Sequence, residues 1–178
     1  DNRLTGNSGN NVLDGKGGVD VMSGKEGNDT YLVDNAKDRV IEKADGGTDI
    51  IRSSVNKTLS ANVENLVLTG TGNLKGYGNS SNNRLTGNSG NNLLNGKAGI
   101  DVMKGNAGND TYIVDHTQDR VIEKANSGTD TIRSSVTETL SANVENLVLA
   151  GTGNLKGYGN SSNNRLTGNS VNNLLDGK

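Results

Sequence analysis

Aspartate recurs in this chain at a spacing of nine residues, and each of these aspartates closes a glycine-rich hexapeptide. Asp20 ends the stretch GKGGVD (15–20), and Asp29 ends GKEGND (24–29). Glycine allows the positive φ angles of tight turns, so such a turn can point several main-chain carbonyl groups at one centre. Carboxylate and carbonyl oxygens are hard ligands that suit Ca²⁺ better than a transition metal. The residue types and their spacing therefore predict calcium-binding turns.

The acidic position continues beyond these two turns and recurs in the second half of the chain. Asp38 follows Asp29 after nine residues, and Asp49 follows after eleven more. The candidate carboxylate ligands are Asp20, Asp29, Asp38, Asp49, Asp101, Asp110, Asp119 and Asp130. The candidate turn residues around them are Gly15, Gly17, Gly18, Gly24, Glu26, Gly27, Gly47, Gly96, Ala98, Gly99, Gly105, Ala107, Gly108 and Gly128.

Short β-strands must position these turns, because each nonapeptide has six turn residues and then three residues with an apolar centre. Leu13, Met22, Tyr31 and Val40 are such centres. Three residues make a strand of roughly 10 Å, which is too short to form a stable sheet alone. Stacked as a right-handed coil with two nonapeptides per turn, these strands bury their apolar centres in a thin shared core. The predicted fold is all-β, a parallel β-roll or β-helix solenoid.

The distance between coils also favours calcium. Nonapeptides alternate between the two sides of the coil, so each turn stacks on the second turn after it. Stacked strands lie about 4.7–4.9 Å apart, which is about twice a calcium–oxygen distance of about 2.3–2.6 Å. A cation is therefore expected wherever two acids stack. The expected pairs are Asp20 with Asp38, Asp29 with Asp49, Asp101 with Asp119, and Asp110 with Asp130.

Asparagine replaces the closing aspartate in other turns of the same frame. A neutral amide is a weaker calcium ligand than a carboxylate, so Asn11 and Asn92 are weaker metal candidates, each stacked with one acid. The turns of Asn2, Asn83 and Asn164 are expected to hold no metal and to form ladders of side-chain amides.

The whole pattern is duplicated with a period of 81 residues. Residues 1–81 and 82–162 differ at only 18 positions, and residues 163–178 begin a third copy. The predicted organisation is one continuous solenoid of two units and a truncated third, excised from a longer parent chain. Eight half-coils are expected in each unit, an even number that returns every unit to the same side of the coil.

The stretches GKGGVDVMS (15–23) and GKEGNDTYL (24–32) resemble the G-G-x-G-x-D-x-U-x repeat of RTX proteins. The longer run from GNDTYLVD to ENLVLTG is similar to the extended repeat regions of RTX proteins that bacteria export by type I secretion. The resemblance implies a calcium-bound parallel β-roll that is unfolded at cytosolic calcium and folds outside the cell. It also implies a secreted or cell-surface location, a larger parent chain and contact with the type I secretion machinery.

Composition and charge argue against several other classes. The net charge is −2, with 18 basic and 20 acidic residues interspersed, which leaves no basic face for nucleic acid. No apolar run is long enough to insert into a membrane, and without cysteine neither disulfides nor zinc thiolates stabilise the chain. Because only 30% of the residues are hydrophobic, something besides apolar burial has to contribute to stability.

The remaining reactive side chains are expected to be structural. His116 takes the place of Asn35 in the second unit and is interpreted as a surface substitution. The serines of RSSV have no histidine partner, so no nucleophile is expected. Glu42 and Glu64, with their copies in the second unit, are interpreted as solvated strand edges rather than as a glycosidase pair.

The sequence thus predicts a non-enzymatic, calcium-dependent structural module that folds on export and acts as a rigid spacer in an adhesin or other exported protein. Two alternatives stay open. One is the repeat region of a secreted hydrolase such as a lipase or protease, and the other is a solenoid that binds a carbohydrate or another ordered surface. The near-identical units favour the spacer, because a tail that only assists an enzyme's folding needs no second copy.

Overall fold

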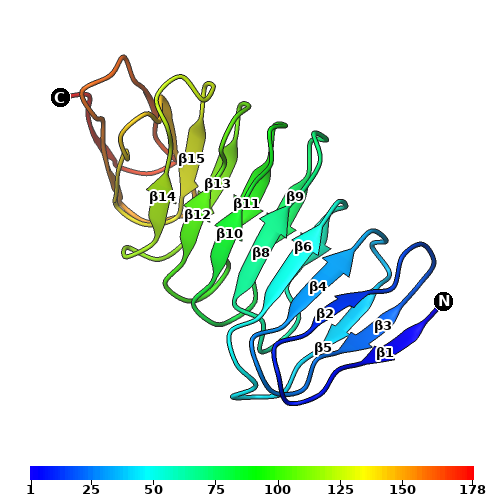
Figure 1. Cartoon of the computed structure of the whole chain (residues 1–178). Coiled ribbons are helices and arrows are strands. Elements are labelled where there is room, and N and C mark those ends of the chain that lie inside the picture. The colour runs from blue at the N-terminus through cyan, green and yellow to red at the C-terminus, as the bar shows by residue number, and fades with distance from the viewer.

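The computed structural model describes residues 1–178 and contains strands but no helix. Consecutive strands stack into an elongated coil whose termini lie at opposite ends (Figure 1). The first ten strands are β1 (Arg3–Thr5), β2 (Val12–Asp14), β3 (Val21–Ser23), β4 (Thr30–Val33), β5 (Arg39–Ile41), β6 (Ile50–Ser53), β7 (Lys57–Thr58), β8 (Asn65–Leu68), β9 (Lys75–Tyr77) and β10 (Arg84–Thr86). The second ten are β11 (Leu93–Asn95), β12 (Val102–Lys104), β13 (Thr111–Val114), β14 (Arg120–Ile122), β15 (Thr131–Ser134), β16 (Glu138–Thr139), β17 (Asn146–Leu149), β18 (Lys156–Tyr158), β19 (Arg165–Thr167) and β20 (Leu174–Asp176). A helix that could cross a membrane is not among these elements.

Strand pairing follows the two sides of the coil, and every pair is parallel. One seven-stranded sheet has the order β14-β12-β10-β8-β6-β4-β2, and the other has the order β19-β17-β15-β13-β11-β9-β7. The first of these sheets contains only even-numbered strands and the second only odd-numbered strands, and we call the two faces of the coil the even-numbered and the odd-numbered side. The three-stranded sheet β1-β3-β5 continues the odd-numbered side, and the three-stranded sheet β16-β18-β20 continues the even-numbered side. Apart from β5 and β14, each strand therefore pairs with the second strand after it, as expected for a solenoid with two strands per coil. The predicted all-β parallel solenoid is confirmed.

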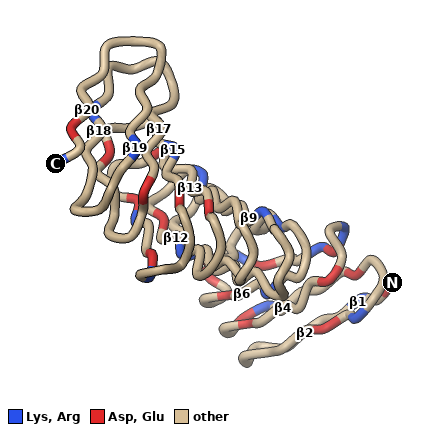
Figure 2. The backbone as a smooth tube through the Cα atoms, turned by 90° about the horizontal axis from the view of Figure 1, so that it is seen from above, with Lys and Arg blue, Asp and Glu red and all other residues tan.

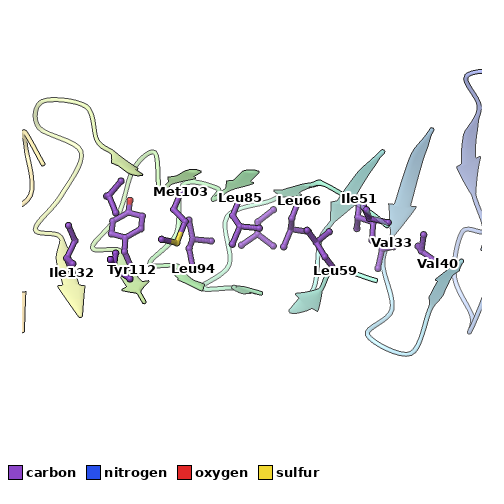
Figure 3. Close-up of a cluster of buried hydrophobic side chains, with 14 of the residues drawn as sticks. Val33, Val40, Ile51, Leu59, Leu66, Leu85, Leu94, Met103, Tyr112 and Ile132 are labelled. Carbon is purple, nitrogen blue, oxygen red and sulfur yellow. The ribbon is translucent and has the colours of Figure 1, made fainter. Parts of the chain in front are cut away.

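The core is a single narrow row of apolar side chains between the two sides (Figure 3). It contains 21 buried hydrophobic residues, most of them at the centre of a short strand. The predicted centres Leu13, Met22, Tyr31 and Val40 are all buried, with at most 7% of their surface exposed. Flanking strand residues point outward because successive side chains of a strand face opposite ways.

The expectation of eight half-coils per unit is wrong. Nine strands precede β10, which repeats the sequence of β1, so β10 lies on the even-numbered side while β1 lies on the odd-numbered side. The strand that the sequence did not reveal is β7, because Lys57–Thr58 has no apolar centre. Leu59 and Val63, which follow it, fill the core there instead. The second unit is consequently turned by half a coil, and equivalent residues of the two units lie on opposite sides.

The sheets are interrupted where the turn after β5 and its copy after β14 are longer. β5 and β7 are not paired, and neither are β14 and β16. In the first unit the buried Lys57 closes the gap, since its Nζ donates a hydrogen bond of 2.7 Å to the carbonyl oxygen of Asp38. In the second unit Glu138 takes the place of this lysine, and burial raises the pKa of its carboxyl group to about 7. The two units thus differ in charge at the same structural seam.

Candidate metal centre

The predicted acid pairs lie together on stacked turns, and a main-chain hydrogen bond joins the two members of each pair. In every case the earlier aspartate donates its N–H to Oδ1 of the later one. The four bonds are Asp20 to Asp38 (2.9 Å), Asp29 to Asp49 (2.7 Å), Asp101 to Asp119 (2.9 Å) and Asp110 to Asp130 (2.8 Å). Each strand therefore starts from an acid that is held in register by the strand one coil earlier.

The second carboxylate oxygen of most of these aspartates is buried and has no hydrogen-bond donor. These orphan oxygens are Oδ2 of Asp20, Asp29, Asp49, Asp101, Asp110 and Asp130. All six residues have at most 1% of their surface exposed. Burying a carboxylate oxygen without a partner is costly, and native structures rarely leave such an atom unexplained. The orphan oxygens therefore indicate that a positively charged group belongs beside them.

Asp38 and Asp119 differ from the other six. Oδ2 of Asp38 accepts a hydrogen bond of 3.1 Å from the N–H of Asn35, and Oδ2 of Asp119 accepts one of 3.1 Å from the N–H of His116. Both oxygens of these two carboxylates thus have donors. His116 itself is part of this turn, where its Nδ1 accepts a hydrogen bond from the N–H of Gln118.

The first glycine of each acid-bearing hexapeptide is needed to admit the acid. A Cβ atom on Gly24 would overlap Oδ2 of Asp29 and the hydroxyl oxygen of Tyr31, whereas one on Gly17 would meet nothing within 4 Å. Gly15, Gly96 and Gly105 have the same relation to the aspartates that close their turns. The second and fourth residues of these turns have positive φ, for example 85° at Lys25 and 102° at Gly27.

The asparagine-bearing turns are built differently. Oδ1 of Asn92 accepts a hydrogen bond of 2.8 Å from the N–H of Asn88, and its Nδ2 donates one of 2.8 Å to Oδ1 of Asn88. Asn11 makes the same two contacts with Asn7. The amide groups of both weaker metal candidates are therefore engaged within their own turns.

The ladders of side-chain amides expected at the turns of Asn2, Asn83 and Asn164 do not form. Their side-chain amides donate instead to main-chain carbonyl groups of neighbouring coils, for example from Asn83 to Val63 and Glu64. An amide N–H₂ group can occupy carbonyl oxygens that would otherwise face a cation. Stacked asparagines do occur at the position directly before the closing residue of a hexapeptide. There, Oδ1 of Asn10 accepts a hydrogen bond from the N–H of Asn28.

Glu42 and Glu123 are not solvated strand edges, and that interpretation is wrong. Each has only 9% of its surface exposed, and each accepts a hydrogen bond from a core tyrosine, Tyr31 or Tyr112. Glu42 opens the turn after β5, at the place that Gly24 holds one coil earlier in the turn after β3. Its side chain therefore points into the coil toward the aspartates of the same side. Carboxylate oxygens of Asp29, Glu42 and Asp49 all lie within 4.8 Å of one another, as do those of Asp110, Glu123 and Asp130.

Glu64 extends the stack of acids that Asp29 and Asp49 form in the first unit. Its Oε2 accepts a hydrogen bond of 2.8 Å from the N–H of Asp49, and Glu145 accepts the equivalent bond from Asp130. The sequence signal was present, because Glu64 stands directly before β8 just as Asp49 stands directly before β6. The nine-residue period does not mark this residue, because Glu64 follows Asp49 after fifteen residues.

The electrostatics of the clusters are those of crowded, buried carboxylates. Burial, followed by the neighbouring acids, raises the pKa of Asp110 to about 7 and that of Asp130 to about 6. Burial and the charge of Asp49 raise the pKa of Glu42 to about 7. The structure contains one ion pair, between Lys16 and Asp14, and Asp14 is not one of the buried acids. No basic side chain therefore forms an ion pair with the buried acids. Figure 2 shows that acidic segments recur along the whole coil.

Family comparison agrees with this geometry. Residues 1–31 and 77–113 match the family model of the RTX calcium-binding nonapeptide repeat, in four copies. The chain carries RTX repeats. The matched segments include the acid-bearing turns 15–29 and 96–110, and the RTX repeat is a structural calcium-binding repeat rather than a catalytic one. Comparisons with curated proteins and with solved structures gave no match.

The orphan oxygens and the glycine cradles fit the ion that RTX repeats bind. Ca²⁺ takes six to eight oxygen ligands in a flexible arrangement, and the acid-bearing turns offer carboxylate oxygens next to main-chain carbonyl groups. The ion would supply positive charge between coils. The chain's own contribution is to hold each acid in register through its hydrogen bond to the coil before.

Proposed function

We propose that this chain is a calcium-dependent structural module whose solenoid folds when Ca²⁺ fills the stacked acid turns. The observation that carries the proposal is the set of six buried aspartate oxygens without a donor. A buried carboxylate that lacks a partner strongly disfavours the folded state. A divalent cation is the simplest partner for these oxygens, because no lysine or arginine reaches them.

The magnitudes support a folding switch. A ligand at about 100 times its dissociation constant stabilises the folded state by about 2.7 kcal/mol per site. Four sites, one for each acid pair, would contribute on the order of 11 kcal/mol, which is comparable to the whole stability of a domain. Without the ion, the stacked acids repel one another across a single strand spacing of about 4.8 Å. Calcium therefore decides between the folded and the unfolded chain.

We also propose that the module belongs to a larger exported protein and works as a rigid spacer outside the cell or at its surface. RTX repeat proteins are typically exported, and a chain that folds only with calcium stays unfolded during passage through a type I secretion channel. The continuous coil formed by two near-identical units supports the spacer, since repetition lengthens a solenoid without adding a new site.

The test is far-UV circular dichroism during a Ca²⁺ titration of the EDTA-treated chain, with Mg²⁺ as the competing ion. We expect a cooperative change from coil to β-structure that Ca²⁺ produces and Mg²⁺ does not. Asp29→Asn combined with Asp110→Asn should weaken the response to calcium. The matched control is Asp34→Asn combined with Asp115→Asn, which removes two exposed acids from the same units and should leave the titration unchanged.

A full β-spectrum in EDTA that calcium does not alter would contradict the proposal. Asparagine hydrogen bonds and apolar stacking would then hold the solenoid without metal. In that case a role in binding an ordered surface would become the stronger candidate.

A further inference from the structure

We propose that Glu42 and Glu123 each complete a three-carboxylate calcium site, formed with Asp29 and Asp49 in the first unit and with Asp110 and Asp130 in the second. The inference rests on the proposed function for the identity of the ion. The inference adds to the proposed function a metal ligand from outside the nonapeptide repeat, because Glu42 and Asp49 lie beyond the matched residues 1–31.

The geometry of the first-unit site brings three buried carboxylates to one centre. Their oxygens lie within 4.8 Å of one another, a separation that one cation can bridge at calcium–oxygen distances of about 2.3–2.6 Å. Oδ2 of Asp29 and Oδ2 of Asp49 are both buried and have no donor. Both aspartates that cluster with the glutamate thus carry a buried oxygen without a donor, which distinguishes this cluster from a group of solvated acids.

A tyrosine holds the glutamate in place. The hydroxyl group of Tyr31 donates to Oε1 of Glu42 and accepts a hydrogen bond of 2.7 Å from the N–H of Gly24. The N–H of Lys43 donates to Oε2 at 3.2 Å. Because an ionised carboxylate has about four lone-pair sites, these two bonds leave both oxygens able to bind metal. The glutamate is therefore oriented but not saturated.

The second unit repeats the arrangement with one further support. Tyr112 donates to Oε1 of Glu123, and Oγ of Ser127 donates to its Oε2 at 2.9 Å. Asp110 and Asp130 again contribute buried Oδ2 atoms without donors. Ser127 replaces a glycine of the first unit, so the glutamate keeps its orientation although the turn around it has changed. The arrangement therefore occurs twice, on opposite sides of the coil.

Terbium provides a direct test, because Tb³⁺ substitutes for Ca²⁺ and emits light when a tyrosine within a few ångströms transfers energy to it. Tyr31 and Tyr112 contact the proposed ligands, whereas Tyr77 and Tyr158 lie on outward positions of β9 and β18. In the full chain, tyrosine excitation should produce strong Tb³⁺ emission that Ca²⁺ displaces. Tyr31→Phe with Tyr112→Phe should abolish most of it, and the control Tyr77→Phe with Tyr158→Phe should not.

The ligand itself is tested with Glu42→Gln combined with Glu123→Gln, which keeps the shape of the side chain and removes its charge. Calorimetry with Ca²⁺ should show one fewer ion bound per unit, and the tyrosine-sensitised emission should fall with it. Circular dichroism in saturating Ca²⁺ checks that the variant is folded.

The outcomes separate this inference from the proposed function. Calcium binding by the wild-type chain without tyrosine-sensitised emission would overturn the three-carboxylate sites and leave the calcium module intact. The same holds if the glutamine variant binds as many ions as the wild type. Absence of calcium binding in the wild type would instead overturn the proposed function. The wild-type terbium measurement decides the matter even if a variant fails to fold.

Discussion

Replacing Asp110 by asparagine should stabilise the calcium-free solenoid and weaken the calcium-bound one. The side chain is 1% exposed, its Oδ1 accepts a hydrogen bond from the N–H of Asn92, and its Oδ2 has no donor. Asparagine keeps the size of the side chain and the Oδ1 acceptor but removes the buried charge. Calcium loses a carboxylate ligand in the same step, so the sign of the effect should depend on whether the ion is present.

The size of the effect follows from the pKa of Asp110, which burial raises from 3.8 to about 7. Each tenfold change in proton affinity corresponds to about 1.4 kcal/mol, so ionising the folded carboxyl group costs up to about 4 kcal/mol. Because the folded pKa lies above the unfolded one, the folded state binds more protons between about pH 4 and pH 7. The contribution of Asp110 to the stability of the calcium-free protein is therefore most favourable below about pH 4 and is lost as the pH rises through about 7.

The assay without calcium is folding by a stabilising osmolyte in EDTA at about pH 8 and about pH 5, because the calcium-free chain is expected to be unfolded in buffer alone. The assay with saturating calcium is thermal or urea unfolding. At about pH 8 in EDTA the variant should be more stable than the wild type by on the order of 2–4 kcal/mol. At about pH 5 the difference should fall to less than half, because the folded wild-type carboxyl group is then protonated while that of the unfolded chain is still mostly ionised. With calcium at about pH 8 the wild type should be the more stable protein. A variant that is less stable in EDTA at both pH values would refute the reasoning.

Three further substitutions test other parts of the structure. Gly15→Ala should cost about 1–3 kcal/mol of stability in calcium, because the new methyl group overlaps the acid that closes the turn, while Gly17→Ala in the same turn should leave the melting temperature nearly unchanged. Glu138→Lys should stabilise the second unit by about 1–3 kcal/mol, because the new ammonium group can donate a charged hydrogen bond to the carbonyl oxygen of Asp119. Hydrogen exchange should then show stronger protection of the amides around β16, and unchanged protection would contradict this expectation. Leu85→Ala removes a fully buried side chain and should cost about 2–5 kcal/mol, as measured by chemical unfolding in saturating calcium.

The parts of the fold that repeat could be predicted from the sequence. A nine-residue period with one apolar centre specifies a strand, a turn and the face that is buried, so Leu13, Met22 and Tyr31 were assigned to the core correctly. The pattern also predicts the pairing of Asp29 with Asp49, although the step from Asp38 to Asp49 is eleven residues, since the acid keeps its place before the strand. Periodicity is informative here because each coil makes the same contacts as its neighbours.

The parts that break the period could not be predicted in this way. β7 is stabilised by a buried lysine ammonium group bonded to a carbonyl oxygen, and no hydrophobic pattern marks such a strand. Glu42 follows a strand, where acids are commonly solvated, and its burial depends on the hydroxyl group of Tyr31 from the other side of the coil. Both are contacts between coils whose partners the local sequence does not specify.

The odd number of strands in each unit has a consequence for the charge of the solenoid. Directly before its strands, the even-numbered side carries the acids Asp29, Asp49, Glu64, Asp101 and Asp119, and the odd-numbered side carries Asp20, Asp38, Asp110, Asp130 and Glu145. With eight strands per unit, the long run of three acids would lie on the same side in both units, and that side would hold six acids against four. The half-coil offset instead gives five on each side, and Asn83 or Asn92 separates the two runs. Repulsion between like charges grows with the length of an unbroken run, so the asparagine turns limit each run to what two or three cations can neutralise. We therefore expect each run to bind calcium as its own cooperative group.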